Sequence, residues 1–406
     1  MSKLLEQINK SSYQLRDLTS LISRGITPTY TEKDGVVILN QKCIRNWVVS
    51  YSESRLTKKE KINSGNKMLK EGDILICSTG VGTLGRVAQV NILNTPTTVD
   101  SHVSIVRPET EKVNPYFLGY ILKKSEKLIE SLAEGSTGQT ELSRTKLQEL
   151  EFELPARVIQ NKVVDMMKNY DAKIENNNKI IKNLEATAQA IFNEWFVDFR
   201  FPGYEKAKFV ESEMGEIPKE WNVGKIKDLI RVESGFPFSS GIFSDLGKYK
   251  LVTIRNVQDG SFVTDCDNLI AELPIKLPKH CLLHSGDILL SLTGNVGRIC
   301  LVNGENYVLN QRVSVLIPVN ERDRAYTYFL FRRSDFQNLL ISISKGTAQL
   351  NLSPVETKEL ETIIPDDITL EKYSEIATPM YKKIVEINSE NMNLKESRDQ
   401  LLAKLI

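Results

Sequence analysis

Apolar residues recur at steps of three and four positions along two long segments of the chain. In the first segment the recurring positions are Ile159, Val163, Met166, Tyr170, Ile174, Asn177, Ile181, Leu184, Ala188, Ile191 and Trp195. In the second they are Tyr373, Ala377, Met380, Ile384, Ile387, Asn391, Leu394, Arg398, Leu401 and Leu405. Lys, Glu, Asn and Gln fill most positions between them, so each segment predicts a helix with one narrow apolar face.

Narrow stripes on helices of about forty residues are typical of coiled coils. Such a helix extends roughly 60 Å, more than the diameter of a domain of about 150 residues. This length argues against the alternative that each stripe packs only on its own globular unit. A parallel pair would force the chain to return over the same distance, so we predict an antiparallel two-helix coiled coil with pseudo-twofold symmetry. Pro379 should kink or delay the second helix, because it lacks an amide hydrogen and restricts Thr378.

Short β-branched runs broken by Gly and Asn precede each long helix. One run, Ile74–Cys77, leads into Gly80–Gly85, which has the G-x-G-x-x-G spacing of a dinucleotide-binding fingerprint, and Asp100 follows about twenty positions later. That fingerprint requires a helix directly after the glycines, since the helix N-terminus holds the pyrophosphate. Arg86–Val90 is instead a short strand-like run, so we interpret the segment as strand, glycine turn, strand.

A second copy of this hairpin lies about 210 positions further on, without the G-x-G-x-x-G spacing. Gly286–Leu289 repeats Gly72–Leu75, and Gly297-Arg298 repeats Gly85-Arg86. Further matches pair Gly25 with Gly235, His102–Ile105 with Arg312–Val315, Tyr116–Leu118 with Tyr328–Leu330, Gly138–Ser143 with Ala348–Ser353, and Leu154-Pro155 with Ile364-Pro365. The period is too long for a solenoid, which indicates a tandem duplication of a whole domain.

These patterns predict an α+β fold of two similar mixed α/β domains, separated by the long antiparallel two-helix coiled coil. Helical patches are expected at Tyr116–Ser131 and Tyr326–Ile341 inside the domains. The predicted boundaries are residues 1–155 and 203–365 for the two domains, and 156–202 and 366–406 for the central and C-terminal long helices.

Composition adds few constraints. The chain has 406 residues and a net charge of +1, so it offers no general attraction to phosphate and would need a basic face or a partner to bind DNA. The sequence has no apolar run long enough for a membrane span, and MSKLLEQINKSSY lacks the apolar stretch of a signal peptide. Five scattered cysteines fit a reducing compartment, so we expect a cytoplasmic protein without a membrane partner.

Basic and polar loops are the candidate binding features. Arg55, Lys58, Lys59, Lys61, Lys67 and Lys70 crowd one loop of the first domain, and Lys248, Lys250, Arg255, Lys276 and Lys279 lie in the second. A solvated surface is the alternative interpretation of such charge runs. Residues 134–140 and 345–349 combine Gly with Ser, Thr and Gln, side chains that contact phosphates and base edges.

The candidate DNA-binding residues stand on these loops or follow the hairpin glycines. For the first domain they are Arg86, His102, Ser136, Thr137 and Gln139, and for the second Arg255, Arg298, Arg312, Lys345, Thr347, Gln349 and Asn351. An arginine directly after a hairpin glycine suits guanine readout or a phosphate clamp, although it also supports the hairpin itself.

No catalytic constellation is present in the sequence. It contains no Walker A motif, no methyltransferase Asn-Pro-Pro-Tyr/Phe tetrad, no helicase acidic box and no convincing nuclease carboxylate cluster. The spacing His280-Cys281-x-x-His284 lacks a second pair of ligands, so we do not expect zinc. The chain is therefore predicted to be non-catalytic and to hold no cofactor or metal.

The segment Ala190–Pro202, followed by Gly215-Glu216-Ile217-Pro218-Lys219-Glu220-Trp221, closely resembles the central region of Type I restriction–modification specificity subunits, as do both Gly-Asp-Ile-Leu hairpins. The resemblance covers essentially the whole chain. One departure is the start of the first domain, where Tyr13–Leu18 stands in the place of Trp221–Leu229 without the Ile-Pro-Lys-Glu-Trp segment.

The resemblance implies two target-recognition domains that each read one half of an asymmetric bipartite site in double-stranded DNA. It implies that the helices dock two adenine methyltransferase subunits that carry S-adenosylmethionine, and through them restriction/translocase subunits that use ATP and Mg²⁺. Leu184–Thr187 resembles the four-residue unit whose copy number changes the spacer between half-sites in some members. Two alternatives remain open: the specificity chain of a fused Type IIB-like restriction–methylation enzyme, and a coiled-coil scaffold that binds no DNA.

Overall fold

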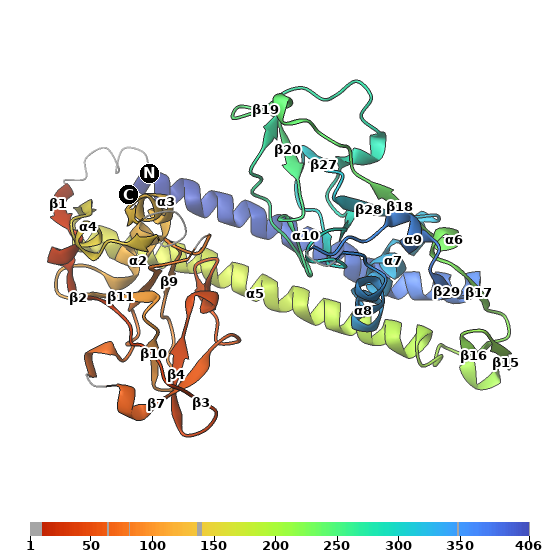
Figure 1. Cartoon of the computed structure of the whole chain (residues 1–406), viewed down its shortest axis with the longest axis horizontal. Coiled ribbons are helices and arrows are strands. Elements are labelled where there is room, and N and C mark those ends of the chain that lie inside the picture. Colours follow the sequence, from red (N-terminus) through yellow and green to blue (C-terminus); the bar gives the residue numbers. More distant parts are fainter. Residues whose placement is uncertain (1–9, 63–64, 81, 136–139, 347–348, 406) are drawn as a thin grey trace. The chain divides into compact units, whose positions relative to one another are not determined.

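The computed structural model describes residues 10–62, 65–80, 82–135, 140–346 and 349–405 (Figure 1). The chain forms two compact units. Unit 1 comprises Met1–Ala172 and Lys395–Ile406, and unit 2 comprises Lys173–Leu394. Each unit therefore takes in part of both long helices, which are α5 (Arg157–Phe196) and α10 (Asp367–Leu405).

Unit 1 contains two four-stranded sheets. The first has the order β2 (Thr19–Arg24), β11 (Val103–Pro108), β8 (Ile74–Cys77), β9 (Val87–Gln89), and all neighbours are antiparallel. The second has the order β10 (Thr97–Val99), β4 (Gly35–Leu39), β7 (Arg55–Lys58), β3 (Tyr30–Thr31), of which only the pair β10–β4 is parallel. The β8–β9 hairpin confirms the strand, turn, strand interpretation of the glycine motif and leaves no place for the helix that a dinucleotide site needs.

Smaller elements complete unit 1. The two-stranded pairs are β1 (Lys10–Gln14) with β14 (Glu151–Pro155), β5 (Ile44–Arg45) with β6 (Val48–Val49), and β12 (Ala133–Glu134) with β13 (Glu141–Leu142). The helices are α2 (Pro115–Lys124), α3 (Glu126–Ser131) and α4 (Arg144–Gln148), with 3₁₀ turns η1 (Leu15–Leu18), η2 (Gln41–Cys43), η3 (Lys59–Lys61) and η4 (Gly65–Lys67).

Unit 2 repeats this plan. Its first sheet has the order β18 (Ile230–Ser234), β28 (Val313–Pro318), β25 (Ile288–Ser291), β26 (Ile299–Leu301). The second has the order β19 (Phe243–Ser244), β23 (Leu269–Ile270), β20 (Tyr249–Val252), β27 (Tyr307–Leu309), β24 (Leu282–Leu283), again with one parallel pair, β20–β27. Because strands from matching sequence positions occupy matching places, the predicted duplication is confirmed.

The remaining elements of unit 2 are short. The strand pairs are β15 (Phe209–Ser212) with β16 (Gly215–Pro218), β17 (Asn222–Lys225) with β29 (Glu361–Ile364), and β21 (Val257–Gln258) with β22 (Ser261–Phe262). The helices are α6 (Ile226–Leu229), α7 (Arg324–Arg332), α8 (Ser334–Ser342) and α9 (Pro354–Lys358), with 3₁₀ turns η5 (Tyr204–Lys206), η6 (Ser240–Ile242), η7 (Lys279–Cys281) and η8 (Glu321–Asp323). The two predicted helical patches are present, but each is divided into two helices, at Ser125 and at Arg333.

The repeated glycines Gly25 and Gly235 mark the same close approach of backbone in both units. A Cβ atom on Gly25 would lie 2.0 Å from the Val99 carbonyl oxygen, and one on Gly235 would lie 2.3 Å from that of Asn310. No side chain fits at either position without moving the neighbouring strand. The sequence match between these two residues therefore reports a shared packing requirement of the sheets.

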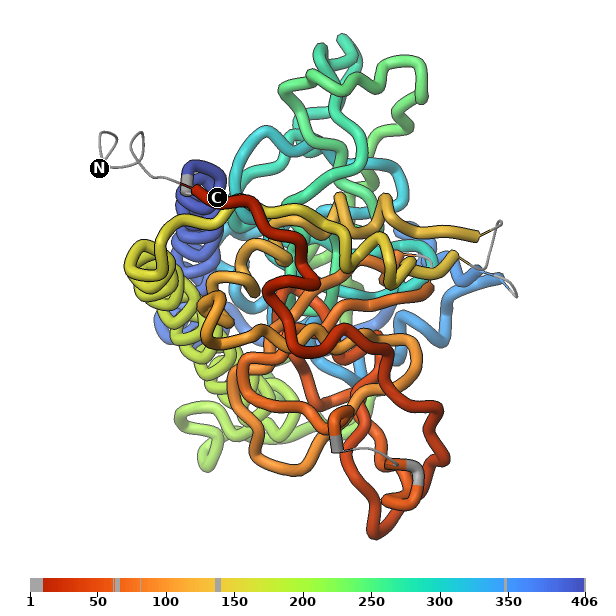
Figure 2. Tube along the Cα trace, turned by 90° about the vertical axis from the view of Figure 1, so that its left-hand side faces the viewer, coloured from red at the N-terminus to blue at the C-terminus, as the bar shows by residue number. Residues whose placement is uncertain are grey.

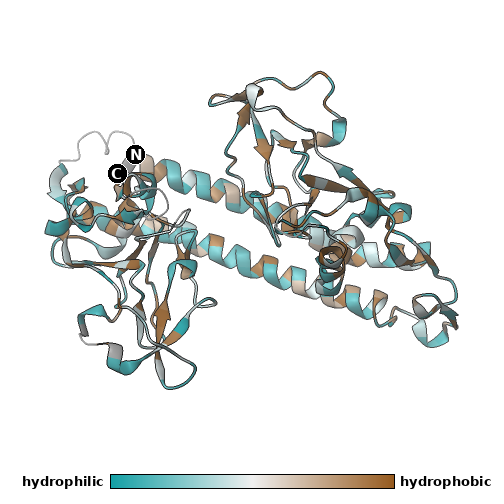
Figure 3. Ribbon diagram, viewed as in Figure 1, coloured by the Kyte–Doolittle hydropathy of each residue, from teal (hydrophilic) through white to brown (hydrophobic). Residues whose placement is uncertain are grey.

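The long helices bury broader faces at their ends than the predicted narrow stripe. Val164 and Met167 near the start of α5 are buried, as are Phe192 and Phe196 near its end, and none of these four belonged to the predicted stripe. Between them the buried face narrows to Ile174, Asn177 and Ala188 with partly buried neighbours. Figure 3 shows polar and apolar residues mixed along both long helices. The extra buried positions pack against each unit's own core.

Within unit 2 the two helices run antiparallel. Asn177 contacts Asn391, whereas Trp195, five turns further along α5, packs on Tyr373 near the start of α10, with ring centroids 5.9 Å apart. Figure 2 shows the traces of the two helices. The aromatic cluster at this end also includes Phe196, which lies 4.9 Å from Tyr326 and 5.0 Å from Tyr373 in edge-on geometry. A coiled coil along the full length of the helices stays a prediction.

The expectation that Pro379 delays the second helix was wrong. α10 begins at Asp367 and continues through Pro379. The cost of the missing amide hydrogen is offset here by burial of the flanking residues Ala377 and Tyr381, which are 1% and 4% exposed.

Unit 1 is completed by the last turns of α10. Leu402 is 1% exposed and lies in the same core as Val163, Val164 and Met167 of α5. Arg398 donates a hydrogen bond to Asp171 at 2.8 Å, and its guanidinium lies 4.2 Å from the Trp47 ring centroid. Asp171 also accepts a hydrogen bond from the Tyr120 hydroxyl at 2.6 Å. Two segments more than two hundred residues apart in sequence thus form one core.

No helix among the described residues is long and apolar enough to cross a membrane.

A buried asparagine pair joins α5 and α10 inside unit 2. The Asn177 amide donates to Asn391 at 2.9 Å and to Glu390 at 2.8 Å, and the Asn391 amide donates to Asn178 at 3.0 Å. Asn177 is 1% exposed and Asn391 is 5% exposed. A polar pair at a helix seam is satisfied in only one register, so it fixes the register at some cost in stability.

Replacing Asn391 by Ala should lower the free energy of unfolding by about 1–3 kcal/mol, because the buried Asn177 amide loses one of its two acceptors and Asn178 loses its donor. The double substitution Asn177→Leu with Asn391→Leu should recover most of that loss, because both polar groups are then removed together. Denaturant unfolding of the chain measures both, with Asn183→Ala at an exposed position of α5 as the control. A loss in Asn391→Ala no larger than in Asn183→Ala would contradict a structural role for the pair.

Candidate nucleic-acid interface

In unit 1, the turn of the β8–β9 hairpin is held by two side chains from distant segments. The Gln41 amide donates to the Thr79 hydroxyl at 2.7 Å and accepts from the Thr83 hydroxyl at 2.8 Å. The Thr79 hydroxyl is also 2.8 Å from Nδ1 of His102, which stands in the turn before β11. His102 is exposed, so its ring is available at the surface next to the hairpin.

The carboxylate of Asp100 organises the turn that carries His102. It accepts the backbone N–H of His102 at 2.9 Å, and burial raises the pKa of this carboxyl group above its ordinary value. A third segment joins the site, because the backbone N–H of Leu142 donates to the Ser78 carbonyl at 2.8 Å and Thr79 pairs with Glu141. The hairpin, the turn before β11 and the segment after α3 therefore meet at one end of the first sheet.

The Arg86 side chain is not fully exposed, as a residue that clamps a DNA phosphate would be. It is half-buried, and its Nη2 donates to the Gly82 carbonyl of its own turn at 2.7 Å. Its Nη1 is buried without a hydrogen-bond partner in the described part of the chain. Ser136, Thr137 and Gln139, which the sequence places on the neighbouring loop, lie outside the described residues.

Unit 2 brings the equivalent three segments together. The hairpin turn after β25 is hydrogen-bonded to the segment before α9. The Gly294 N–H donates to the Leu350 carbonyl at 2.9 Å, and the Leu352 N–H donates to the Leu292 carbonyl at 2.7 Å. Lys345 and Asn351 exchange backbone hydrogen bonds of 2.9 and 2.8 Å, so they close a small loop beside the hairpin. Thr347 of this loop lies outside the described residues.

The side chains of this loop differ in their availability. Gln349 and Asn351 are exposed, and a Cβ atom on Gly294 would lie 3.6 Å from Nε2 of Gln349, so this amide borders the hairpin turn. The Lys345 ammonium forms an ion pair with Glu356. Arg312, at the position of His102, is exposed and its guanidinium has no partner among the described residues.

Arg298 is held by a residue that the sequence patterns did not identify. Its Nη1 donates to Oε1 of Gln258 at 2.6 Å, and its backbone N–H donates to the Ser291 hydroxyl at 3.0 Å. The Gln258 amide in turn donates to the Arg255 carbonyl at 2.9 Å, while the Arg255 guanidinium pairs with Asp267. Gln258 and Arg298 are 40 positions apart, and no local pattern marks such a contact; Gln41 of unit 1 was missed for the same reason.

Several residues of the predicted basic loops have partners of their own. The Lys67 ammonium donates to the Gly25 carbonyl at 2.8 Å, and the Arg55 guanidinium lies 4.8 Å from the Tyr30 ring centroid. Lys248 and Lys250 lie over Tyr249 and Tyr307, at 5.4 and 5.1 Å from the ring centroids. Several of these basic side chains therefore form contacts within the protein.

The segment with metal-like spacing is engaged in packing. Nε2 of His280 is 2.9 Å from the Ser234 carbonyl oxygen, and Cys281 is buried in the core, where burial raises its thiol pKa to about 11. Among the described residues there is no cluster of three or more His, Cys, Asp or Glu side chains suited to a metal ion.

Comparison with known proteins connects both units to one family. Residues 9–186 and 218–394 each match the family described as "Type I restriction modification DNA specificity domain". The chain is 28% identical over 389 residues to the Type I restriction enzyme MjaIX specificity subunit of Methanocaldococcus jannaschii, covering 94% of this chain and 86% of that protein. It is 23% identical over 455 aligned positions to the HindI specificity subunit of Haemophilus influenzae, covering 97% and 98%.

The fold has a counterpart among solved structures. The S subunit of a Type I restriction–modification system from M. genitalium superposes with a TM-score of 0.53 at 17% identity, over 98% of this chain and 96% of that one. The two family matches together span most of the chain. The chain therefore belongs to the family of Type I restriction–modification DNA specificity domains.

Proposed function

We propose that this chain is the sequence-reading subunit of a Type I restriction–modification enzyme, in which each unit contacts one half of an asymmetric bipartite DNA site. One observation carries the proposal: two units of the same topology present three converging loops at the same end of the same sheet, and the loops differ in sequence. The turn between the matched Thr-Gly and Gly-Arg pairs contains Val81–Leu84 in one unit and Asn295-Val296 in the other. Direct readout depends on the side chains that reach base edges, so different loops read different sequences.

Partners supply what this chain lacks. Two methyltransferase subunits, bound along α5 and α10, would carry S-adenosylmethionine, and restriction/translocase subunits joined through them would use ATP and Mg²⁺. The near-zero net charge supports this division, because weak attraction to phosphate leaves much of the affinity to the assembled complex. The family match and the names of the relatives favour this role over a scaffold that binds no DNA.

The purified chain should transfer no methyl group and should bind duplex DNA weakly. Adding the cognate methyltransferase subunit should tighten sequence-specific binding, and the logarithm of the affinity should then fall linearly with the logarithm of the salt concentration. Fluorescence anisotropy across a salt series measures the binding, and transfer of a labelled methyl group measures the activity. Methyl transfer by the chain alone, or an affinity unchanged by the partner, would refute the assignment of roles.

Replacing Arg298 by Ala should weaken recognition of one half-site only, by about 1–3 kcal/mol if its guanidinium makes a bidentate base contact. Gln258→Ala should produce a smaller loss at the same half-site, because Gln258 positions Arg298 at 2.6 Å without reaching DNA itself. Arg86→Ala is the matched variant and should affect only the other half-site. An equal loss on every DNA sequence would identify Arg298 as a phosphate contact.

Duplicating Leu184–Thr187 should lengthen the spacer between half-sites by about one or two base pairs. Four residues add roughly 6 Å and return to within about 40° of the original helix face, and one base pair adds about 3.4 Å and 36°. Glu185 accepts the Tyr328 hydroxyl at 2.6 Å, and the duplicated copy supplies a Glu for the same contact.

The matched control for this duplication is a two-residue insertion at the same point. It turns the apolar face by about 200°, so Ile191 and Trp195 would leave the helix seam and assembly with the methyltransferase subunits should be lost. Mapping methylated adenines in cells that express each variant gives the spacer directly. An unchanged spacer in the four-residue variant would reject the helix as the ruler.

A further inference from the structure

A hollow of about 470 Å³ opens over the first sheet of unit 2, away from the converging loops. Its floor is apolar and consists of Leu282, Val315 and Ile317. Charged and titratable side chains surround this floor: Arg231, Glu233, Lys279, His280, His284, Asp287 and Arg324. The position of Asp287 before β25 places the hollow at the start of that strand, whereas the reading turn follows its end.

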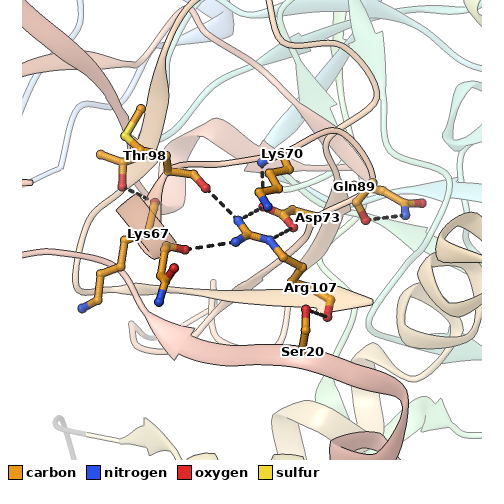
Figure 4. Close-up of polar contacts among 10 residues, drawn as sticks. Ser20, Lys67, Lys70, Asp73, Gln89, Thr98 and Arg107 are labelled. Carbon is orange, nitrogen blue, oxygen red and sulfur yellow. Dashed lines mark hydrogen bonds and ion pairs between the residues drawn. The ribbon is translucent and has the colours of Figure 1, made fainter. Parts of the chain in front are cut away.

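The equivalent place in unit 1 is filled by one arginine side chain (Figure 4). The Arg107 guanidinium donates two hydrogen bonds to the carboxylate of Asp73, from Nε at 2.8 Å and from Nη2 at 2.7 Å. It also donates to the backbone carbonyls of Met68 at 2.7 Å and Asn66 at 3.2 Å. Asp73 is 1% exposed, so the guanidinium covers its carboxylate.

Sheet register shows that the two units carry inverted versions of one cross-strand pair. Arg107 of β11 pairs with Leu21 of β2, whereas Ile317 of β28 pairs with Arg231 of β18. In unit 2 the arginine therefore stands on β18 and not on β28, one strand further from the carboxylate of Asp287. The volume that Arg107 fills in unit 1 is left open in unit 2, and a cation stands at its border.

The carboxylate of Asp287 already has compensating partners. It accepts the His284 backbone N–H at 2.7 Å, and Nη1 of Arg324 lies 3.6 Å from its other oxygen. Burial raises the pKa of this carboxyl group, and Arg324 is further held by Glu321. The counter-charge that Arg107 supplies in unit 1 comes from Arg324 in unit 2.

The remaining cations at the rim are uncommitted. No hydrogen bond or ion pair of the Arg231 or Lys279 side chain is found in the described part of the chain, and both residues are exposed. Both imidazoles at the rim have partners, since Nε2 of His280 lies 2.9 Å from the Ser234 carbonyl oxygen and Nδ1 of His284 lies 3.8 Å from Asp287. No ion pair of the Glu233 carboxylate is found in the described part of the chain. Two uncommitted cations against one acid favour an anionic ligand.

We propose that this hollow binds a phosphate group, held by Arg231 and Lys279 over the apolar floor. A planar guanidinium and an ammonium are the side chains that recognise phosphate most often, and the apolar floor accepts the sugar or base attached to it. Arg231 lies three residues along β18 from Ser234, so the hollow is about 10 Å from the loop end of the sheet. That distance allows two sources, a backbone phosphate of bound DNA or a free nucleotide. The DNA source rests on the proposed function.

The test compares Arg231→Leu, which installs the residue that unit 1 has at this position, and Ile317→Arg, which refills the hollow as Arg107 does. Lys219→Leu removes an exposed cation outside the hollow and is the control. Calorimetric titration of the chain with inorganic phosphate and with adenosine monophosphate should show binding at least about tenfold weaker in the first two variants than in the unmodified chain. The control should bind both ligands as tightly as the unmodified chain. Circular dichroism establishes that each variant is folded.

Salt titrations of duplex binding in the presence of the methyltransferase subunit distinguish the two sources. A DNA phosphate in the hollow predicts that Arg231→Leu weakens binding equally on all sequences and lowers the salt slope by about 0.9. A free nucleotide predicts an unchanged slope and tighter binding of the nucleotide than of inorganic phosphate. Unchanged phosphate binding and an unchanged slope in both variants would overturn the site. Absence of DNA binding by the unmodified complex would instead refute the proposed function and leave the phosphate titration as the deciding measurement.

Discussion

The strands in the described part of the chain are two to six residues long, and one face of the first sheet in each unit is buried against the two long helices. The first turns of α5 and the last turns of α10 close the core of unit 1, where Met167 and Leu402 are almost fully buried. The end of α5 and the start of α10 do the same for unit 2, through Phe192, Trp195 and Tyr373. Each domain therefore depends on chain segments that belong to both helices. This dependence explains why unit 1 is not complete until the last residues of α10 have been added.

The duplicated domains keep their framework and change their surface. Gly25 and Gly235, and the carboxylates Asp73 and Asp287, meet the same packing requirements in both units. The hairpin turns differ in length and in the partner of the arginine that follows: Arg86 binds its own turn, whereas Arg298 binds Gln258. Equivalent positions on β11 and β28 also differ, since unit 1 has Arg107 where unit 2 has Ile317. A conserved scaffold with freely varied loop ends is what a protein that reads two unrelated half-sites requires.

Sequence patterns predicted the elements that repeat or that follow a regular period. The duplication, the hairpin at Gly80–Gly85 and both long helices could be read directly, because period and repetition leave a local signal. The breaks at Ser125 and Arg333, the continuation of α10 through Pro379 and the contacts of Gln41 and Gln258 could not. Each of these depends on packing or hydrogen bonding between residues far apart in sequence. The predicted DNA contacts stay a prediction, since which side chains reach a base depends on the geometry of the complex.

We propose that the two units read two different half-sites. The most direct test maps methylated adenines across the genome of cells with and without this gene, in the presence of its methyltransferase partner. Two unlike half-sites predict one added motif with two unlike specified halves separated by an unspecified spacer of fixed length. A palindromic motif, a continuous one, or no added motif in the presence of an active methyltransferase would contradict it.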